Sequence, residues 1–284
     1  MDPEIVTFTI PTENNKIVFV WNINAQLPEG EIYCSLEKVF SQFGPLYSLK
    51  LLPNASVAEP GYYAVLKYYS SQSAKRAQAA CDKKNLFQDT PVKVKICVKQ
   101  KGFHYKSMEL YGYRCQELAN YYLGFNGWCK RIIALQNITG LDDDPEMESD
   151  PQKQGNLRYL CVVEVALPHH GVCSRGVGVA EERLEKRNDP LEYISKSGRI
   201  QKYAVQKALS NAFQKILLVV FDNGKVAVEY VSGEEDVDCL TEEELQGLIQ
   251  VNDFTWAPKD SGEGGEDEED WADFTLHEDT LVDL

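Results

Sequence analysis

The stretch from Leu110 to Trp128, LYGYRCQELANYYLGFNGW, predicts a helix that ends at a glycine and turns into an aromatic segment. One apolar stripe at helical spacing runs along it, formed by Tyr111, Cys115, Leu118 and Tyr122. Gly124 stands where a left-handed residue commonly ends a helix, and Ser107 is the candidate N-cap. Two aromatic side chains, Phe125 and Trp128, then lie on a tight turn.

This motif begins at Arg114 and continues as LANYYLGFNGW to Trp128. It resembles the core motif of the Rad52 single-strand annealing family of recombination proteins. The resemblance implies a β-β-β-α fold that binds single-stranded DNA. The alternative is a coincidental amphipathic helix with a glycine-rich end.

The N-terminal third of the chain alternates strand and helix patterns. Residues 1–14 are expected to be a loose lead-in, and residues 15–100 a domain. Within that domain the periodicities predict strands at 16–23, 46–52, 62–68 and 92–98 and helices at 28–43 and 73–84. The order β-α-β-β-α-β is the ferredoxin-like pattern.

Two segments of this domain resemble the motifs of an RNA recognition motif. Residues 18–23, VFVWNI, are similar to the shorter motif and place Phe19 at its stacking position, with Trp21 where glycine is usual. Residues 61–68, GYYAVLKY, are similar to the longer motif. Tyr63 keeps its first aromatic position, but Val65 stands at the second.

Alternation along these strands predicts one open face of the sheet. Aromatic and basic side chains share that face, namely Phe19, Trp21, Tyr63, Lys67, Lys93, Lys95 and Lys99. Aromatic rings stack on single-stranded bases and lysines neutralise phosphates, so nucleic-acid binding is expected here. The alternative is a protein-binding relative whose sheet is covered.

A second domain is predicted at residues 107–231. After the aromatic turn, strands are expected at 129–141, 157–167 and 172–180, followed by a helix from about 192 to 217. Gly176 and Gly178 are similar to a Gly-x-Gly strand of the annealing family, where a close backbone approach calls for glycine. Asn223-Gly224 predicts a hairpin between the two final strands.

Basic residues of this domain are candidates for a DNA groove. The resemblance implies that Arg114 and Lys207 line it, while Gln206 and Ser210 stand where the family has basic residues. In the helix predicted at about 192–217, an apolar stripe is formed by Val205, Leu209, Ala212 and Ile216. Gln206, Lys207 and Ser210 lie on the opposite face of that helix. The full candidate set is Arg114, Phe125, Trp128, Lys130, Arg131 and Lys207. The alternative for the cations is ordinary surface charge.

The acidic charge of the protein is concentrated at one end. Residues 232–284 hold 19 of the 44 Asp and Glu residues but one of the 29 Lys and Arg residues. Such a composition predicts a mostly disordered tail. Three roles are open for it: a solubilising tail, a segment that binds protein partners, or an internal competitor that imitates nucleic acid.

The expected fold class is therefore α+β, with a ferredoxin-like domain, a β-β-β-α domain and an acidic tail. The resemblance implies a non-enzymatic protein of the DNA damage response that binds single-stranded DNA, with RNA as a second ligand and homo-oligomers as an option. An interaction scaffold with vestigial nucleic-acid surfaces is the alternative. No cofactor or metal site is expected, because no nucleophile–base set and no ligand cluster is visible.

Membrane association and secretion are not expected. The chain has no run of about 18 apolar residues. Its first residues, MDPEIVTFTIPTENNK, do not resemble a signal peptide. The eight cysteines form no C-x-x-C motif, which fits a reducing compartment. We therefore expect the protein in the nucleus and cytoplasm.

Overall fold

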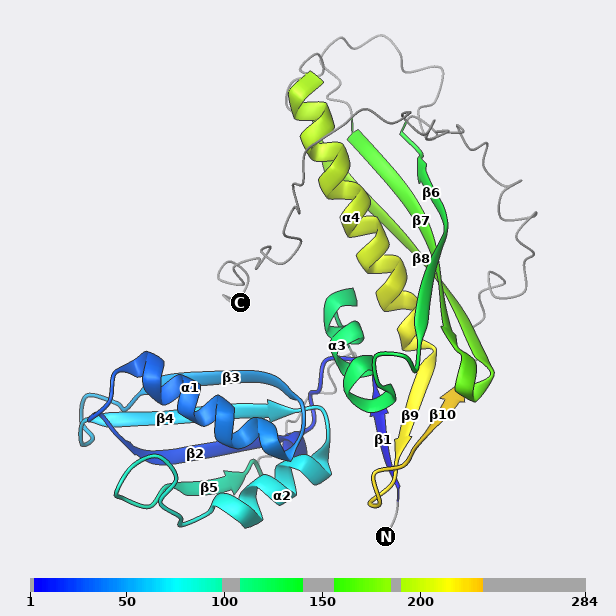
Figure 1. Cartoon of the computed structure of the whole chain (residues 1–284). Helices are drawn as coiled ribbons and strands as arrows, with labels where there is room; N and C mark the ends of the chain where they lie inside the picture. Colours follow the sequence, from blue (N-terminus) through cyan, green and yellow to red (C-terminus); the bar gives the residue numbers. More distant parts are fainter. Residues whose placement is uncertain (1–2, 99–107, 140–155, 185–189, 232–284) are drawn as a thin grey trace, which may run out of the picture. The chain divides into compact units, whose positions relative to one another are not determined.

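The computed structural model describes residues 3–98, 108–139, 156–184 and 190–231 (Figure 1). These residues form three antiparallel sheets and four α-helices. No helix in the described ranges is long and apolar enough to cross a membrane. The acidic tail, Lys99, Ser107 and the loop at 140–155 lie outside the described residues.

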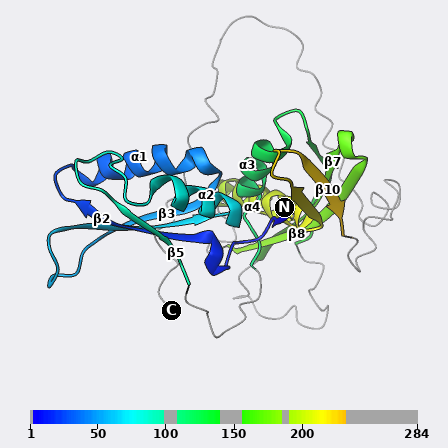
Figure 2. The same cartoon turned by 90° about the horizontal axis from the view of Figure 1, so that it is seen from below.

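The first domain has the predicted β-α-β-β-α-β order. Its elements are β2 (Ile17–Asn24), α1 (Glu29–Phe40), β3 (Leu46–Pro53), β4 (Gly61–Tyr68), α2 (Ser71–Cys81) and β5 (Lys93–Ile96). The strands are ordered β3-β4-β2-β5, and both helices lie on one face of this sheet (Figure 2). Helix α2 begins two residues before the predicted start, because the Ser70 side chain caps it by accepting a hydrogen bond from Ser73 N.

The core of this domain lies between the sheet and the two helices. Alternate strand residues point into it, including Val18, Val20, Ala64, Leu66 and Val94, all of which are fully buried. The period of two places the intervening residues on the opposite face. The predicted division of the strands into a buried and an outward face is therefore confirmed.

The second domain has the predicted β-β-β-α core. Its elements are α3 (Gly112–Leu123), β6 (Cys129–Asn137), β7 (Asn156–Leu167), β8 (Val172–Arg183) and α4 (Pro190–Gln214). The three strands form one sheet in the order β6-β7-β8, and α4 lies along one face of it (Figure 1). The central strand β7 directs Leu157, Cys161, Val163 and Val165 into the core beneath α4.

Two glycines of β8 allow α4 to approach the sheet closely. A Cβ atom on Gly176 would lie 2.1 Å from the carbonyl oxygen of Ala208, and one on Gly178 would lie 2.3 Å from that of Ala204. Both distances are far below van der Waals contact. The predicted reason for the Gly-x-Gly pattern is confirmed: backbone meets backbone at an alanine stripe of α4.

A third sheet closes the second domain and corrects one expectation. Strands β9 (Ile216–Val220) and β10 (Val226–Tyr230) form the predicted hairpin, with Gly224 at a φ of +79°. The N-terminal strand β1 (Glu4–Thr7) pairs with β9. The expectation of a loose lead-in is therefore wrong for Glu4–Thr7, because the alternation of this short strand buries Val6 in the core.

The helix that opens the second domain starts later than the sequence suggested. Tyr111 occupies the N-cap of α3 and is exposed, so it does not belong to the buried stripe. Gly112 takes the contact with α4, where a Cβ would lie 2.4 Å from the Gln206 Oε1. The predicted end is confirmed: Gly124 follows the last helical residue with a φ of +81°.

Candidate nucleic-acid interface

A β-bulge shapes the outward face of the first domain. Two residues of β2, Trp21 and Asn22, oppose the single residue Tyr63 of β4. Asn22 adopts a φ of +66°, a region that asparagine tolerates better than most residues. Its Nδ2 donates to the Pro91 carbonyl at 2.7 Å, and Gln88 Nε2 donates to the Asn22 carbonyl at 2.8 Å. These bonds fix the backbone that carries Trp21.

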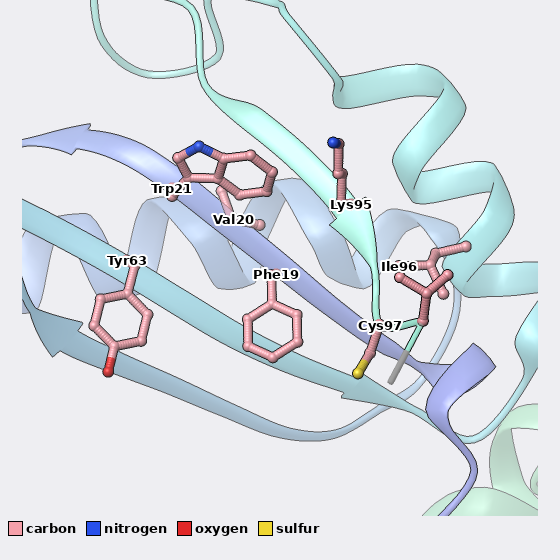
Figure 3. A pocket seen from close by; sticks show the side chains of 8 residues that line it. Phe19, Val20, Trp21, Tyr63, Lys95, Ile96 and Cys97 are labelled. Carbon is pink, nitrogen blue, oxygen red and sulfur yellow. The ribbon is translucent and has the colours of Figure 1, made fainter. Parts of the chain in front are cut away.

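Three aromatic side chains gather on this face. Phe19, Trp21 and Tyr63 lie on neighbouring strands β2 and β4 and point away from the helices (Figure 3). They line an open concavity of about 550 Å³, together with Val20, Lys95, Ile96, Cys97 and Val98. The predicted aromatic residues are thus brought together in one place.

Lysines border this aromatic cluster. The register places Lys95 beside Phe19 and Lys93 beside Trp21, both on the edge strand β5. The Lys95 Nζ lies 5.9 Å from the centre of the Trp21 ring, within cation–π range. Both lysines are exposed, so they can reach solvent and phosphates.

The structure places one lysine beside the aromatic cluster that the sequence analysis did not include. It also shows that a predicted lysine points elsewhere. Lys50 on β3 lies opposite Val65 and is exposed on the same face. The alternation of β3 contained that signal, but β3 carries no recognised motif. Lys67, which was predicted to join the aromatic cluster, directs its Nζ over the Tyr47 ring, 5.4 Å from its centre.

In the second domain, Arg114 is engaged within its own helix. Its Nη1 donates to the Glu117 Oε2 at 3.1 Å, and its guanidinium lies 5.4 Å from the Tyr113 ring centre. Burial is the largest single effect and would lower the pKa of Arg114, but the Glu117 carboxylate together with nearby tyrosines outweighs it, so the pKa is raised. Arg114 is permanently charged, and Glu117 offsets much of that charge.

Lys130 and Arg131 lie on opposite faces of the sheet because they are consecutive strand residues. Lys130, on the side of the helices, donates from Nζ to the Gln116 Oε1 at 3.1 Å. Arg131, on the other face, pairs with Glu164 at 2.8 Å. Arg175 also binds Glu164, so the three strands carry an Arg131–Glu164–Arg175 ladder at one register position.

The ladder holds its central carboxylate in the charged form. Burial would raise the pKa of Glu164, but hydrogen bonds from Arg131 and Arg175 outweigh it and lower that pKa. The ladder therefore joins two positive charges to one negative charge. The ladder lies on the face that α4 does not cover.

Lys207 lies on a third part of the domain, at the outer edge of β8. Its Nζ donates to the Val179 carbonyl at 3.0 Å. Ser210 does not occupy the exposed face that the sequence suggested. It is buried, and its hydroxyl donates to the carbonyl of Leu110, because α4 is covered by α3 as well as by the sheet. The serine at this position therefore contributes to helix packing and not to a solvent-facing groove.

The two aromatics of the turn differ in exposure. Trp128 packs against Phe213 with ring centres 5.3 Å apart, and its Nε1 donates to the Asn120 Oδ1 at 2.8 Å. Phe125 is exposed at the tip of the turn. The four predicted cations of this domain are distributed over two faces and an edge, so the described residues do not form one basic cluster. Within the described ranges, no group of three or more His, Cys, Asp or Glu residues is placed to hold a metal ion.

Comparison with known proteins agrees with this architecture. Residues 25–92 match the RNA recognition motif model, and residues 110–217 match the model described as the RDM1 DSRM domain. RAD52 motif-containing protein 1 from Gallus gallus is 50% identical, with 98% of this chain and 97% of that protein covered. The Homo sapiens protein of that name is 45% identical, with 97% and 96% covered. The Danio rerio protein is 42% identical, with 97% and 98% covered. With such identity over nearly the whole of each chain, this chain belongs to the RAD52 motif-containing protein 1 family.

Proposed function

We propose that this chain is a non-enzymatic protein that binds single-stranded DNA, and also RNA, through the outward face of its RNA recognition motif. The single observation that carries the proposal is the cluster of Phe19, Trp21 and Tyr63 bordered by lysines. Aromatic rings stack on any base, each contributing roughly 1–3 kcal/mol. Such a surface favours single strands, because their bases are not held in a duplex and can stack on protein rings.

The arrangement of charges supports a defined strand path across this face. Lys93 and Lys95 border the aromatic cluster on β5, and Lys50 borders it on β3. Phosphates flanking two stacked bases would meet lysines on both sides. Three phosphate contacts predict a slope of about −2 for log affinity against log salt on a single strand.

The second domain contributes additional contacts in this proposal. Phe125 supplies an exposed ring, Lys130 and Lys207 supply ammonium groups, and Arg131 supplies a half-exposed guanidinium that also pairs with Glu164. Arg114 is offset by Glu117. Each module alone would bind weakly, and linkage through one chain raises the effective concentration of the second module once the first has bound.

We place this activity in the DNA damage response and in recombinational repair, with the protein in the nucleus and cytoplasm. The support is membership in a family named for a RAD52 motif. Cells lacking the protein should become more sensitive to DNA-damaging agents, and wild type but not a binding-deficient variant should restore resistance. Equal rescue by both would contradict the assignment. Imaging of the tagged full chain tests the compartment.

Anisotropy of labelled single strands, DNA and RNA, with the full chain across salt tests the binding surface. Phe19→Ala should weaken binding by about five- to 150-fold, which corresponds to the loss of one stacked base. Tyr33→Ala is the matched control, because Tyr33 is 39% exposed and Phe19 is 36% exposed, but Tyr33 lies on α1 behind the sheet. Equal effects of the two changes, or none, would overturn this assignment.

A protein-interaction scaffold is the second candidate. The observation that favours it is the engagement of two predicted DNA contacts, Arg114 and Arg131, by carboxylates of the same domain. Val65 at a stacking position points the same way. Full-length protein that binds neither DNA nor RNA at low salt would support the scaffold and exclude the first proposal.

A further inference from the structure

The two edges of the β6-β7-β8 sheet differ in how their backbone is protected. An edge strand presents unpaired N–H and C=O groups on one side, which can pair with another strand. Strands β6 and β8 are the two edges of this sheet. How each edge is treated therefore indicates where the sheet can be extended.

Side chains from α4 and the residue after it close the β8 edge. Lysine Nζ atoms donate to carbonyl oxygens of β8 in three places, from Lys196 to Arg183, from Lys207 to Val179 and from Lys215 to Arg175. In a fourth place the Asn211 Oδ1 accepts from the Val177 N–H at 3.1 Å. These four contacts occupy outward backbone groups between Arg175 and Arg183, so a further strand that pairs there would have to displace them.

The outward backbone groups of the β6 edge are not bonded by side chains of the described residues. The alternation of the ladder directs the backbone groups of Lys130, Ile132, Leu135 and Asn137 away from β7. Among the described residues, no side chain donates to or accepts from these outward backbone groups. Two of the four side chains are apolar and exposed, Ile132 at 48% and Leu135 at 36%. An open edge with exposed apolar side chains is a site for strand pairing.

The sequence of β6 is complementary to itself when two copies run antiparallel. If Ile132 of one copy is placed opposite Leu135 of the other, the twofold axis also places Leu135 opposite Ile132. The same register places Lys130 opposite Asn137, so no lysine faces a lysine. The bulge between Ile132 and Ala134 lies at the centre in both copies. In this register, the backbone groups that face each other are the ones that point away from β7 in each copy.

We propose that β6 pairs with β6 of a second copy of this chain, joining two three-stranded sheets into one six-stranded sheet. Backbone hydrogen bonds supply the pairing, and burial of the apolar pair fixes the register. The interface is isologous, so it closes at a dimer and does not propagate. The proposal is independent of nucleic-acid binding.

Sedimentation of the full chain without nucleic acid tests the dimer. The wild type should show a mass that rises from monomer to dimer with concentration. Ile132→Glu and Leu135→Lys should each weaken dimerisation by at least about tenfold, because each places a charge in the apolar pair. Val179→Glu is the matched control, because Val179 is 44% exposed on the closed edge β8.

Mixing the two variants tests the register. A chain with Ile132→Glu and a chain with Leu135→Lys would place Glu opposite Lys at one contact and leave the wild-type pair at the other. The mixture should therefore recover dimers that neither variant forms alone. A wild type that remains monomeric, a control that weakens dimers equally, or a mixture that recovers no dimer would each overturn the proposal.

Discussion

Lys207 donates a hydrogen bond from its Nζ to the carbonyl oxygen of Val179 at 3.0 Å, and so joins α4 to the outer edge of β8. The sequence motif predicts the same residue as a phosphate contact. An ammonium group has three donors, and the carbonyl uses one of them. Lys207 therefore serves the fold of the domain whether or not it also contacts a phosphate.

Replacing Lys207 with methionine should separate these two roles. Loss of the hydrogen bond to Val179 should lower the free energy of unfolding by about 1 kcal/mol. Lys75→Met on α2 is the control, because that lysine is exposed on a helix of the other domain. Urea unfolding measures the difference, and an unchanged stability of the Lys207 variant would contradict the structural role. If Lys207 also contacts a phosphate, the salt slope should fall by about 1.

Alanine at Gly176 should destabilise the second domain strongly. Its Cβ would lie 2.1 Å from a backbone oxygen of α4, which cannot move without separating helix and sheet. Overpacked cores typically lose about 1–3 kcal/mol, and we expect a loss at the upper end of that range because the clash is with backbone. Thermal unfolding measures it.

Gly198→Ala provides the control of opposite sign. Gly198 lies in the same α4, and its Cβ would meet nothing within 4 Å. Alanine there should stabilise the helix by up to about 1 kcal/mol. Two glycine-to-alanine changes with the same sign would show that the close approach is not the cause.

Phenylalanine at position 65 should strengthen single-strand binding. Val65 lies between Phe19 and Lys50 on the outward face, at the position where RNA recognition motifs commonly have a second stacking ring. A new ring there should contribute about 1–3 kcal/mol, or at least about fivefold in affinity. Val57→Phe on the exposed β3–β4 loop is the control. Anisotropy with a gain in both variants, or in neither, would contradict the predicted strand path.

The Arg131–Glu164–Arg175 ladder should make stability depend on pH. Because the pKa of Glu164 is lowered in the folded state, its contribution is present above its ordinary pKa of 4.5 and is lost as pH falls below it. Glu164→Gln should cost about 1 kcal/mol at pH 7, since Arg131 is half exposed to solvent. Denaturant unfolding at pH 7 and pH 3 measures this. A cost that persists at pH 3 would assign the effect to packing.

Local patterns predicted much of the candidate interface. Alternation alone placed Phe19, Trp21 and Tyr63 on one face, because a strand has a period of two whatever surrounds it. The register between strands was not visible in the sequence. The register between β2 and β4 depends on the bulge at Asn22, which is held by hydrogen bonds with a loop more than sixty residues away. The register between β3 and β4 places Lys50 opposite Val65 and so beside the cluster.

The basic residues of the second domain show where the sequence was insufficient. Lys130 and Arg131 are neighbours in sequence but lie on opposite faces, and each engages a partner distant along the chain, Gln116 and Glu164 respectively. Ser210 fits a solvent-facing stripe by its polarity alone, yet it is buried and donates to the Leu110 carbonyl just before α3. A helical wheel divides a helix into one buried and one exposed face. Helix α4 packs against both the sheet and α3, so residues on two of its sides are buried.

The sequence by itself determined the order of elements, the buried stripes and the family motifs, because these follow from short-range periodicity and backbone preferences. Only the tertiary structure decided three further features: the pairing of Glu4–Thr7 with Ile216–Val220, the side-chain bonds on the β8 edge, and the lack of such bonds from described residues on the β6 edge. Each depends on groups that meet across long separations in the chain. Their meeting is set by packing of the whole domain, which no local pattern encodes.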